Sequence, residues 1–167
     1  MILAFFDENG REQMIKCTLC YIEDNGKYLM MFRNKKENDP NAGKWIGIGG
    51  KFLEGETAEE CMLREVREET GLTLSFWQFH GIVEFRSDAW EFEDMYLFSA
   101  KAPEGASVDP DRCSEGTLQW IEKEKVLQLP IWEGDRLFLE KLIAGEDAIN
   151  MTLKYQGENL VREDEVK

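Results

Sequence analysis

The sequence predicts one α/β domain, and three observations indicate this class. Two strand-like stretches flank Asp24-Asn25-Gly26, a turn sequence typical of a β-hairpin. A helix with a start signal at Thr57 and a stop signal at Gly71 follows them. Neither an internal repeat nor a linker divides the 167 residues, a length that suits one domain with a sizeable core. We therefore expect residues 15–167 to fold as a single domain.

The strands are expected where β-rich stretches lie between polar turns. In chain order they are 15–23, 27–33, 44–50, 72–86 in two pieces broken near 78–81, 91–101, 117–121, 151–155 and 160–162. The segments 34–43 and 102–115 are expected to be loops, and the second is long enough to indicate function or disorder. Residues 1–14 are either an extension or an edge strand, with Met14 as an alternative start to Met1.

The central helix is expected over the residues that follow Thr57. Thr57 and Glu60 have the spacing of a capping box, in which each side chain satisfies a free backbone N–H group of the first turn. Gly71 stands where a helix ends in a left-handed residue. Residues 123–128 are expected to form one or two helical turns. Residues 133–144 place four apolar side chains at helical spacing and are expected to pack on the sheet.

One face of the central helix is acidic. At about 100° per residue, Glu65, Glu68 and Glu69 fall within an arc of roughly 100°. Such carboxylates repel one another, so the arrangement does not stabilise an isolated helix. Most acidic helix faces are simply solvated, and that interpretation stands as the alternative. A bound divalent cation would relieve the repulsion.

The composition limits the partners and the compartment. A net charge of −14 opposes binding to a nucleic-acid polymer or an anionic membrane, but not to a nucleotide held through a metal ion. No apolar run reaches the length of a membrane span, and 1–6 lacks the basic start of a signal peptide, so we expect a cytoplasmic protein. The four cysteines are expected to be small buried side chains in a reducing compartment, with redox chemistry a distant second: Cys17, Cys20, Cys61 and Cys113.

The segment from Gly50 to Leu72 has the pattern G-x5-E-x7-R-E-V-x-E-E-x-G-L. This pattern resembles the signature of the Nudix hydrolases at every defined position. The resemblance implies a Nudix-type α/β/α sandwich with a mixed central sheet, and cleavage of a nucleoside diphosphate linked to another group. Three shorter motifs, GKWIGIGGK, EGTLQW and LPIWEGD, make the chain similar to the MutT-type 8-oxo-dGTP diphosphatases of Gram-positive bacteria.

The acidic face supplies the chemistry that phosphoanhydride hydrolysis requires. The reaction needs charge neutralised on the phosphate oxygens and a nucleophilic water, and Mg²⁺ held by hard oxygen ligands provides both. The resemblance implies that the Gly50 carbonyl, Glu65 and Glu69 hold Mg²⁺, with Mn²⁺ as a substitute. Glu68 is a further ligand or a proton acceptor. A ligand from a distant loop is also expected at Glu115, with three acidic rivals, Glu91, Glu93 and Asp94.

Two more residues of the signature are expected to support catalysis. Arg64 is placed to pair with a glutamate of the loop or the helix, and so to aim the carboxylates. The pattern gives Glu56 the same task, although a plain surface ion pair is an equally good interpretation of Glu56. With these two, the expected catalytic set is Glu56, Arg64, Glu65, Glu68 and Glu69.

The triphosphate is expected to contact Lys51, which directly follows the metal-site glycine, and Arg33, which ends a strand at the polar loop. Trp132 is the best candidate for stacking on a purine, worth about 1–3 kcal/mol, with a core aromatic as the alternative. Asp135 is placed to read a purine edge. Ile46 occupies the position at which mammalian relatives read the base with an asparagine.

The leading hypothesis is a Mg²⁺-dependent pyrophosphohydrolase acting on 8-oxo-dGTP or a similar oxidised purine nucleotide, an activity of nucleotide-pool sanitation. Water attack at the β-phosphorus would give the monophosphate and pyrophosphate. One alternative is a Nudix hydrolase for a nucleotide sugar or a dinucleoside polyphosphate, since substrate choice depends on loops outside the signature. A non-catalytic nucleotide-binding module is less favoured because the signature carboxylates are all present. The sequence carries no prediction of oligomeric state.

Overall fold

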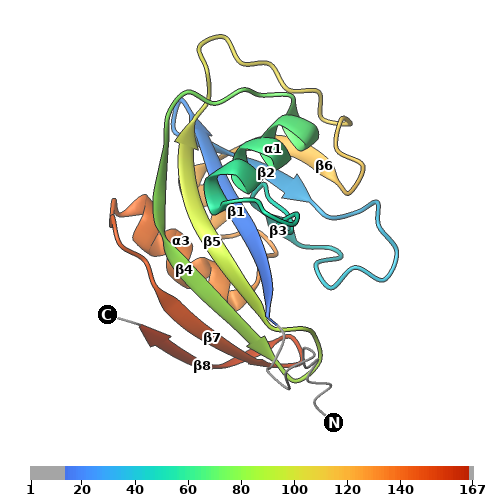
Figure 1. Ribbon diagram of the computed structural model, residues 1–167, viewed down its shortest axis with the longest axis vertical. Helices are drawn as coiled ribbons and strands as arrows, with labels where there is room; N and C mark the ends of the chain where they lie inside the picture. The colour runs from blue at the N-terminus through green and yellow to red at the C-terminus, as the bar shows by residue number, and fades with distance from the viewer. Residues whose placement is uncertain (1–13, 166–167) are drawn as a thin grey trace.

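The computed structural model describes residues 14–165, and within them eight strands form one mixed sheet (Figure 1). The strands run in the order β3-β2-β1-β5-β4-β7-β8, and β6 pairs with β2. The expectation for residues 1–14 falls, apart from Met14, outside the described residues. The elements are β1 (Ile15–Asp24), β2 (Lys27–Phe32), β3 (Trp45–Ile46), α1 (Ala58–Thr70), β4 (Trp77–Ser87), β5 (Glu93–Lys101), β6 (Thr117–Glu122), α2 (Lys123–Val126), α3 (Glu133–Ile143), β7 (Met151–Gln156) and β8 (Asn159–Glu165).

The sheet is mixed because hairpins and crossovers alternate along the chain. β1 and β2 are antiparallel neighbours joined at Asn25 and Gly26, whose φ angles of 48° and 75° suit a tight hairpin turn. β1 pairs with β5 in parallel, as β4 does with β7. A helix lies in the chain before each parallel return, as crossover connections require. The expected hairpin at Asp24-Asn25-Gly26 is confirmed.

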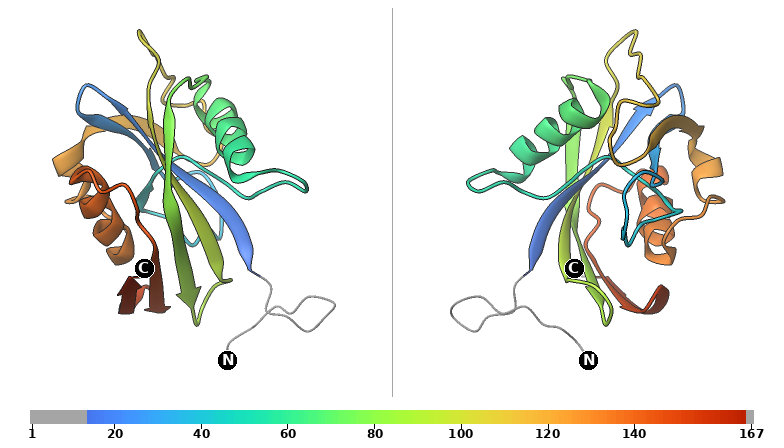
Figure 2. Two further views of the ribbon diagram at one scale, coloured as in Figure 1. Left: turned by 60° about the vertical axis from the view of Figure 1, so that its left-hand side comes forward. Right: turned by 90° about the vertical axis from the view of Figure 1, so that its right-hand side faces the viewer.

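Helices cover both faces of the sheet. α1 lies on one face and α3 on the other, which the edge-on views of Figure 2 show. A core cluster that contains Met62 and Val66 fills the space between α1 and the sheet. A second cluster, which contains Phe138 and Leu139, fills the space under α3. The α/β/α sandwich expected from the sequence is confirmed, and we call its two sides the α1 face and the α3 face.

The expected strand over residues 44–50 forms only in part. Trp45 and Ile46 pair with β2, and the chain then crosses to β1 through the isolated bridges Ile48–Cys20 and Lys51–Cys17. β1 and β2 pair only next to their turn and diverge beyond it, which leaves a gap between them. The crossing segment fills the gap. It fits only without a side chain at Gly49, where a Cβ would lie 1.8 Å from the Thr18 carbonyl oxygen.

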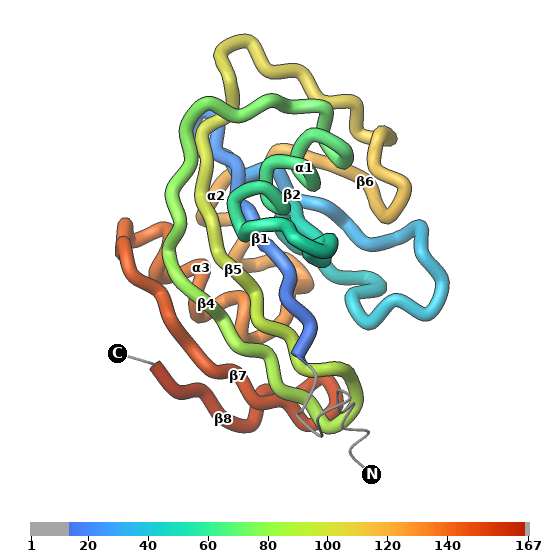
Figure 3. Tube along the Cα trace, viewed as in Figure 1, coloured from blue at the N-terminus to red at the C-terminus, as the bar shows by residue number. Residues whose placement is uncertain are grey.

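The remaining differences from the sequence predictions lie at strand ends and at one irregularity. Residues 72–76 are not a strand, and β4 runs unbroken from Trp77 to Ser87. The break expected near residues 78–81 appears as a register shift against β5 between Phe79 and Gly81. Both expected loops have no helix or strand, and the tube in Figure 3 shows them on the same side of the molecule. None of the helices within residues 14–165 has the length and apolar character needed to span a membrane.

Candidate active site

The central helix is held in register by its ends. Thr57 accepts a hydrogen bond from the Glu60 amide at 3.2 Å, and Glu60 accepts one from the Thr57 amide at 3.2 Å. Gly71 closes the helix at φ 78°, and its amide donates to the Arg67 carbonyl. Both signals read from the sequence are confirmed. The caps fix the rotation of α1, and this rotation directs its acidic residues toward the segment around Gly50.

Glu65 and Gly50 lie against each other. A Cβ on Gly50 would be 2.6 Å from the carboxyl carbon of Glu65, so any larger residue here would displace this carboxylate. The Gly50 carbonyl accepts a hydrogen bond from the Thr18 amide at 2.9 Å, and the Cys61 thiol lies 3.6 Å from it. The sequence thus places an acid and a backbone carbonyl side by side, with one acceptor position of that carbonyl used by the sheet.

Arg64 donates hydrogen bonds to three carboxylates of the site. Its Nε donates to Glu56 Oε2 at 2.6 Å and its second terminal nitrogen donates to Glu56 Oε1 at 3.0 Å. The other terminal nitrogen donates to Glu65 at 2.7 Å and to Glu68 at 3.2 Å. The hydrogen bonds to Arg64 and to the Leu53 amide lower the Glu56 pKa to about 2. One guanidinium therefore aligns three carboxylates.

Glu69 differs from the other acids of the helix because it is buried, with 8% of its surface exposed. Its pKa is raised to about 9, mainly by burial and then by repulsion from Glu65 and Glu115. Within residues 14–165 no hydrogen-bond donor reaches its Oε2 atom. A buried carboxylate oxygen without a partner is costly, and a bound cation would satisfy it.

The donor set fits a hard divalent cation, although it is not a preformed cage. Among the described residues, no three acidic, histidine or cysteine side chains converge as metal ligands. Arg64 pairs with Glu65 and Glu68. Glu69 is buried, and the Glu65 carboxylate lies within hydrogen-bonding reach of it. Oxygen-only donors with one orphaned buried oxygen suit Mg²⁺ or Mn²⁺. Glu65, Glu68 and Glu69 are the residues that would hold it.

Glu115 reaches the same α1 face from the long loop. Arg33 donates to Glu115 Oε2 at 2.7 Å, and the negative charge of Glu115 contributes to the raised pKa of Glu69. Of the rivals for this position, Asp94 pairs with Arg86 elsewhere in the sheet, at 2.9 Å. Arg33 itself is buried, and its Nε donates to Asp39 at 2.6 Å. The triphosphate contact expected of Arg33 stays a prediction.

Trp132 lies on the α3 face and is 6% exposed. Its ring packs edge-on against Trp90 and Tyr155, with centroids 5.4 and 5.2 Å away. Its Nε1 donates to Asn41 at 2.8 Å, and the Lys44 ammonium lies 4.4 Å from the ring centroid. The packing is that of a core aromatic, with Lys44 over one face of the ring. The stacking of Trp132 on a purine stays a prediction.

Asp135 follows Trp132 in the first turn of α3 and is also buried. Its pKa is raised to about 7, mainly by burial and also by the negative charge of Glu93, while the positive charge of Lys44 opposes the shift. The pKa of Glu93 is itself raised by burial, while Lys51 lowers it. Near neutral pH Asp135 can therefore serve either as a hydrogen-bond donor or as an acceptor.

The structure does not bring Ile46 to Trp132 and Asp135. Ile46 pairs with Met31 and packs with the core cluster of the α1 face, whereas Trp132 and Asp135 belong to the α3 face. Lys51 is exposed at the bridge to Cys17, with its charge close enough to Glu93 to lower the Glu93 pKa. The expected substrate residues thus separate into a group near the carboxylates and a group near Trp132.

Sequence reasoning missed three polar residues of the loop that precedes β3. Asp39 binds Arg33, Asn41 accepts from Trp132, and Lys44 covers the Trp132 ring. Asp39 and Asn41 flank Pro40 and indicated only a turn. Lys44 also pairs with Glu158 of the β7–β8 turn at 2.8 Å, a partner 114 residues away that no local pattern indicates.

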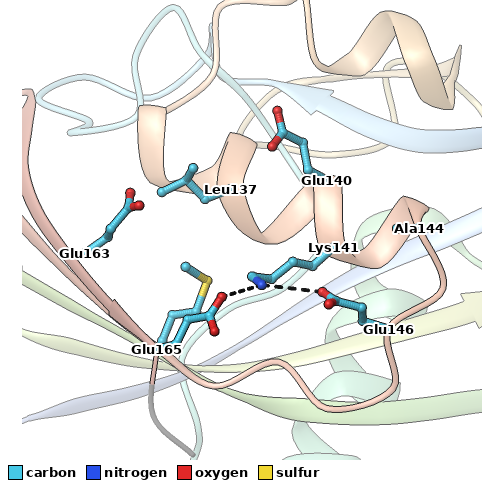
Figure 4. A pocket seen from close by; sticks show the side chains of 8 residues that line it. Leu137, Glu140, Lys141, Ala144, Glu146, Glu163 and Glu165 are labelled. Carbon is cyan, nitrogen blue, oxygen red and sulfur yellow. Dashed lines mark ion pairs between the residues drawn. The ribbon is translucent and has the colours of Figure 1, made fainter.

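A cavity of about 450 Å³ lies away from both groups, between α3 and β8. Figure 4 shows Lys141 between Glu146 and Glu165, with the apolar side chain of Leu137 to the upper left. Lys141 pairs with both glutamates. None of the residues predicted for catalysis or substrate binding lines this cavity.

An α/β/α sandwich whose capped helix presents arginine-aligned carboxylates beside a glycine turn defines a class, the metal-assisted phosphoanhydride hydrolases. The family model described as the NUDIX domain matches residues 16–142. The chain belongs to the Nudix family and is a phosphoanhydride hydrolase. Enzymes of this family generally need a divalent metal ion and act on small nucleotide substrates.

The chain is similar to an oxidized purine nucleoside triphosphate hydrolase of Danio rerio, with 30% identity over 147 residues, 87% of this chain and 90% of the relative. It is also similar to the Bacillus subtilis (strain 168) Nudix hydrolase YvcI, with 26% identity over 145 residues, 86% of this chain and 88% of the relative. Among solved structures, the MutT protein of Bacillus halodurans matches with a TM-score of 0.78 and 24% identity. That match covers 91% of this chain and 97% of the other, and it shows the shared fold.

Proposed function

We propose that this enzyme hydrolyses 8-oxo-dGTP or a related oxidised purine nucleoside triphosphate to the monophosphate and pyrophosphate, with Mg²⁺ as the metal and Mn²⁺ as a substitute. The observation that carries the choice of base is the pair Trp132 and Asp135. Asp135 is a buried acid whose raised pKa of about 7 makes both protonation states available at neutral pH. Oxidation of a purine exchanges acceptor and donor positions on its edge, and such a carboxyl group can match either.

The relatives support the same choice. The Danio rerio enzyme, named an oxidized purine nucleoside triphosphate hydrolase, aligns over 87% of this chain. A Mus musculus enzyme of the same name is 31% identical over 109 residues, 65% of this chain and 68% of the relative. The alignment with the Danio rerio enzyme is long enough to span the carboxylates of α1 and both Trp132 and Asp135. A hydrolase of oxidised purine nucleotides is therefore the most specific function that fits.

The roles of the residues follow from their positions. Glu65, Glu68 and Glu69 would hold the metal, which neutralises charge on the phosphate oxygens and activates water. Arg64 keeps the first two of these carboxylates aligned. Glu68, the most exposed of the three, serves either as a further ligand or as the acceptor of the proton that water releases. Lys51, exposed beside Gly50, is available to neutralise charge on the β- and γ-phosphates, which become the pyrophosphate product.

A nucleotide panel with Mg²⁺ tests the substrate. We expect 8-oxo-dGTP or 2-oxo-dATP to have the highest kcat/KM, above dGTP, ADP-ribose and diadenosine polyphosphates. Glu69→Gln should abolish turnover, while Glu59→Gln, an exposed acid of the first turn of the same helix, should leave turnover unchanged. A preference for ADP-ribose or a diadenosine polyphosphate would contradict the proposed substrate. The assignment as a Nudix hydrolase would still hold.

The position of attack is tested with ¹⁸O-labelled water. Attack at the β-phosphorus places the label in pyrophosphate. Label in the nucleoside monophosphate would show attack at the α-phosphorus and would contradict the expected attack at the β-phosphorus.

A further inference from the structure

Arg33 joins two loops that are far apart in sequence and adjacent in space. Its Nε donates to Asp39 Oδ2 at 2.6 Å, within the loop that follows β2. Its NH1 donates to Glu115 Oε2 at 2.7 Å, at the end of the loop that precedes β6. Figure 3 shows these two loops on one side of the molecule, next to the end of β2.

The ion pair between Arg33 and Asp39 is buried, and only Glu115 is partly exposed. The side chains of Arg33 and Asp39 are 8% and 2% exposed, whereas that of Glu115 is 36% exposed. Asp39 also accepts a hydrogen bond from the Asn41 amide at 3.0 Å, which fixes its carboxylate. The guanidinium is thus anchored at its buried end and presents its other end to a carboxylate at the edge of the site.

Further contacts around Arg33 tie the same two loops together. Asn34 and Thr117 are joined through their side chains at 3.1 Å. Lys35 donates to the Cys113 carbonyl at 3.1 Å, two residues before Glu115. The Cys113 thiol in turn contacts the Met31 sulfur on β2, at 3.7 Å. The backbone next to Glu115 is therefore held to the end of β2, and Arg33 fixes the side chain.

We propose that Arg33, anchored by Asp39, is a positioning residue that holds Glu115 on the α1 face as a ligand for the divalent cation. The proposal rests on the proposed metal-dependent hydrolysis and assigns Arg33 a task other than triphosphate binding. The Arg33 contact uses Oε2 of Glu115 and does not involve Oε1. A planar guanidinium fixes a carboxylate in a way that a flexible ammonium does not.

The test measures Mn²⁺ binding in the absence of nucleotide, from the electron paramagnetic resonance signal of free Mn²⁺. We expect Arg33→Lys to raise the dissociation constant of Mn²⁺ about tenfold, the lower end of the effect of residues that orient metal ligands. Glu115→Gln should raise it at least as much. The double variant should bind Mn²⁺ no more weakly than Glu115→Gln alone, because Arg33 acts through Glu115.

Arg86→Lys is the matched control. Arg86 is also mostly buried, with its side chain 11% exposed, and it also bridges two carboxylates, Glu84 at 2.5 Å and Asp94 at 2.9 Å. We expect Arg86→Lys to leave Mn²⁺ binding unchanged. If Arg33→Lys does not fold, Asp39→Asn tests the same point, since it removes the anchor and keeps both Arg33 and Glu115.

Three results would overturn the proposal. Wild-type Mn²⁺ affinity in Glu115→Gln would show that Glu115 is not a ligand. Fully additive losses in the double variant would show that Arg33 acts on the metal without Glu115. If Arg33→Lys leaves Mn²⁺ affinity unchanged but weakens nucleotide binding, Arg33 contacts the triphosphate and does not position Glu115. Because no nucleotide is present in the Mn²⁺ measurement, an error in the proposed substrate does not change its outcome.

Discussion

Arg64 and Glu56 form a two-pronged ion pair, with Nε to Oε2 at 2.6 Å and the second terminal nitrogen to Oε1 at 3.0 Å. The pair joins the loop before α1 to the middle of α1. It leaves one terminal nitrogen of Arg64 for Glu65 and Glu68. Geometry of this kind is specific to a guanidinium, because a lysine ammonium cannot make the parallel pair.

Arg64→Lys should therefore lower kcat with little effect on folding. We expect a loss of about 10- to 100-fold at saturating Mg²⁺, the range for residues that aim metal ligands. The measurement is steady-state hydrolysis of the preferred nucleotide, together with a thermal unfolding curve. Arg67→Lys, an exposed arginine of the same helix, is the control and should retain full activity. Equal activities of Arg64→Lys and Arg67→Lys would show that Arg64 does not align the carboxylates.

The raised pKa of Glu69 predicts a stability that depends on pH and on metal. Its folded-state pKa of about 9 lies above the usual value of 4.5, so folding favours the protonated form. The stabilisation is complete below pH 4.5 and is lost as the pH rises through about 9. We expect the metal-free Tm to fall over this window and Mg²⁺ to restore it, with a larger gain at pH 8 than at pH 5.

Glu69→Gln is the variant that checks this assignment, because glutamine cannot ionise. Its metal-free Tm at pH 8 should exceed that of the wild type, and its response to Mg²⁺ should be small. Glu59→Gln, on the exposed first turn, should behave as the wild type in both respects. If Mg²⁺ raises the Tm of Glu69→Gln as much as that of the wild type, Glu69 is not a ligand of the metal.

The raised pKa of Asp135 predicts that base binding also depends on pH. Its pKa of about 7, raised from 3.8 mainly by burial, means that Asp135 changes its hydrogen-bonding role near neutral pH. We expect the relative affinities for 8-oxo-dGMP and dGMP, measured by calorimetry, to change across pH 6–8. In Asp135→Asn this change should disappear. Asp111→Asn, a highly exposed acid, should keep it.

The burial of Trp132 predicts that its truncation affects stability as well as binding. Trp132→Ala removes a side chain that packs against three aromatic rings, and we expect a loss of about 3–5 kcal/mol in the free energy of unfolding. Trp132→Phe keeps most of the packing but loses the hydrogen bond to Asn41, at a cost of about 1 kcal/mol. Urea unfolding measures both. A stable Trp132→Ala protein would contradict the core packing.

Local features were readable from the sequence because their causes lie within a few residues. The capping box at Thr57 and the left-handed Gly71 depend on neighbours along the chain, and both are as expected. The pairing of Arg64 with loop and helix glutamates was expected from the resemblance of the signature and from short spacings. Ile46 could not be placed this way, because a residue's face depends on how its strand meets the rest of the sheet.

The sequence by itself determined the acid-rich helix, the glycine turn that Glu65 approaches, and through them the family and its chemistry. Only the tertiary structure decided that Arg33 bridges Asp39 and Glu115, that Glu69 is buried, and that Lys44 covers Trp132. These relationships join residues from separate elements and loops. Their geometry follows from the sheet order and the two helical layers, which no local pattern in the chain encodes.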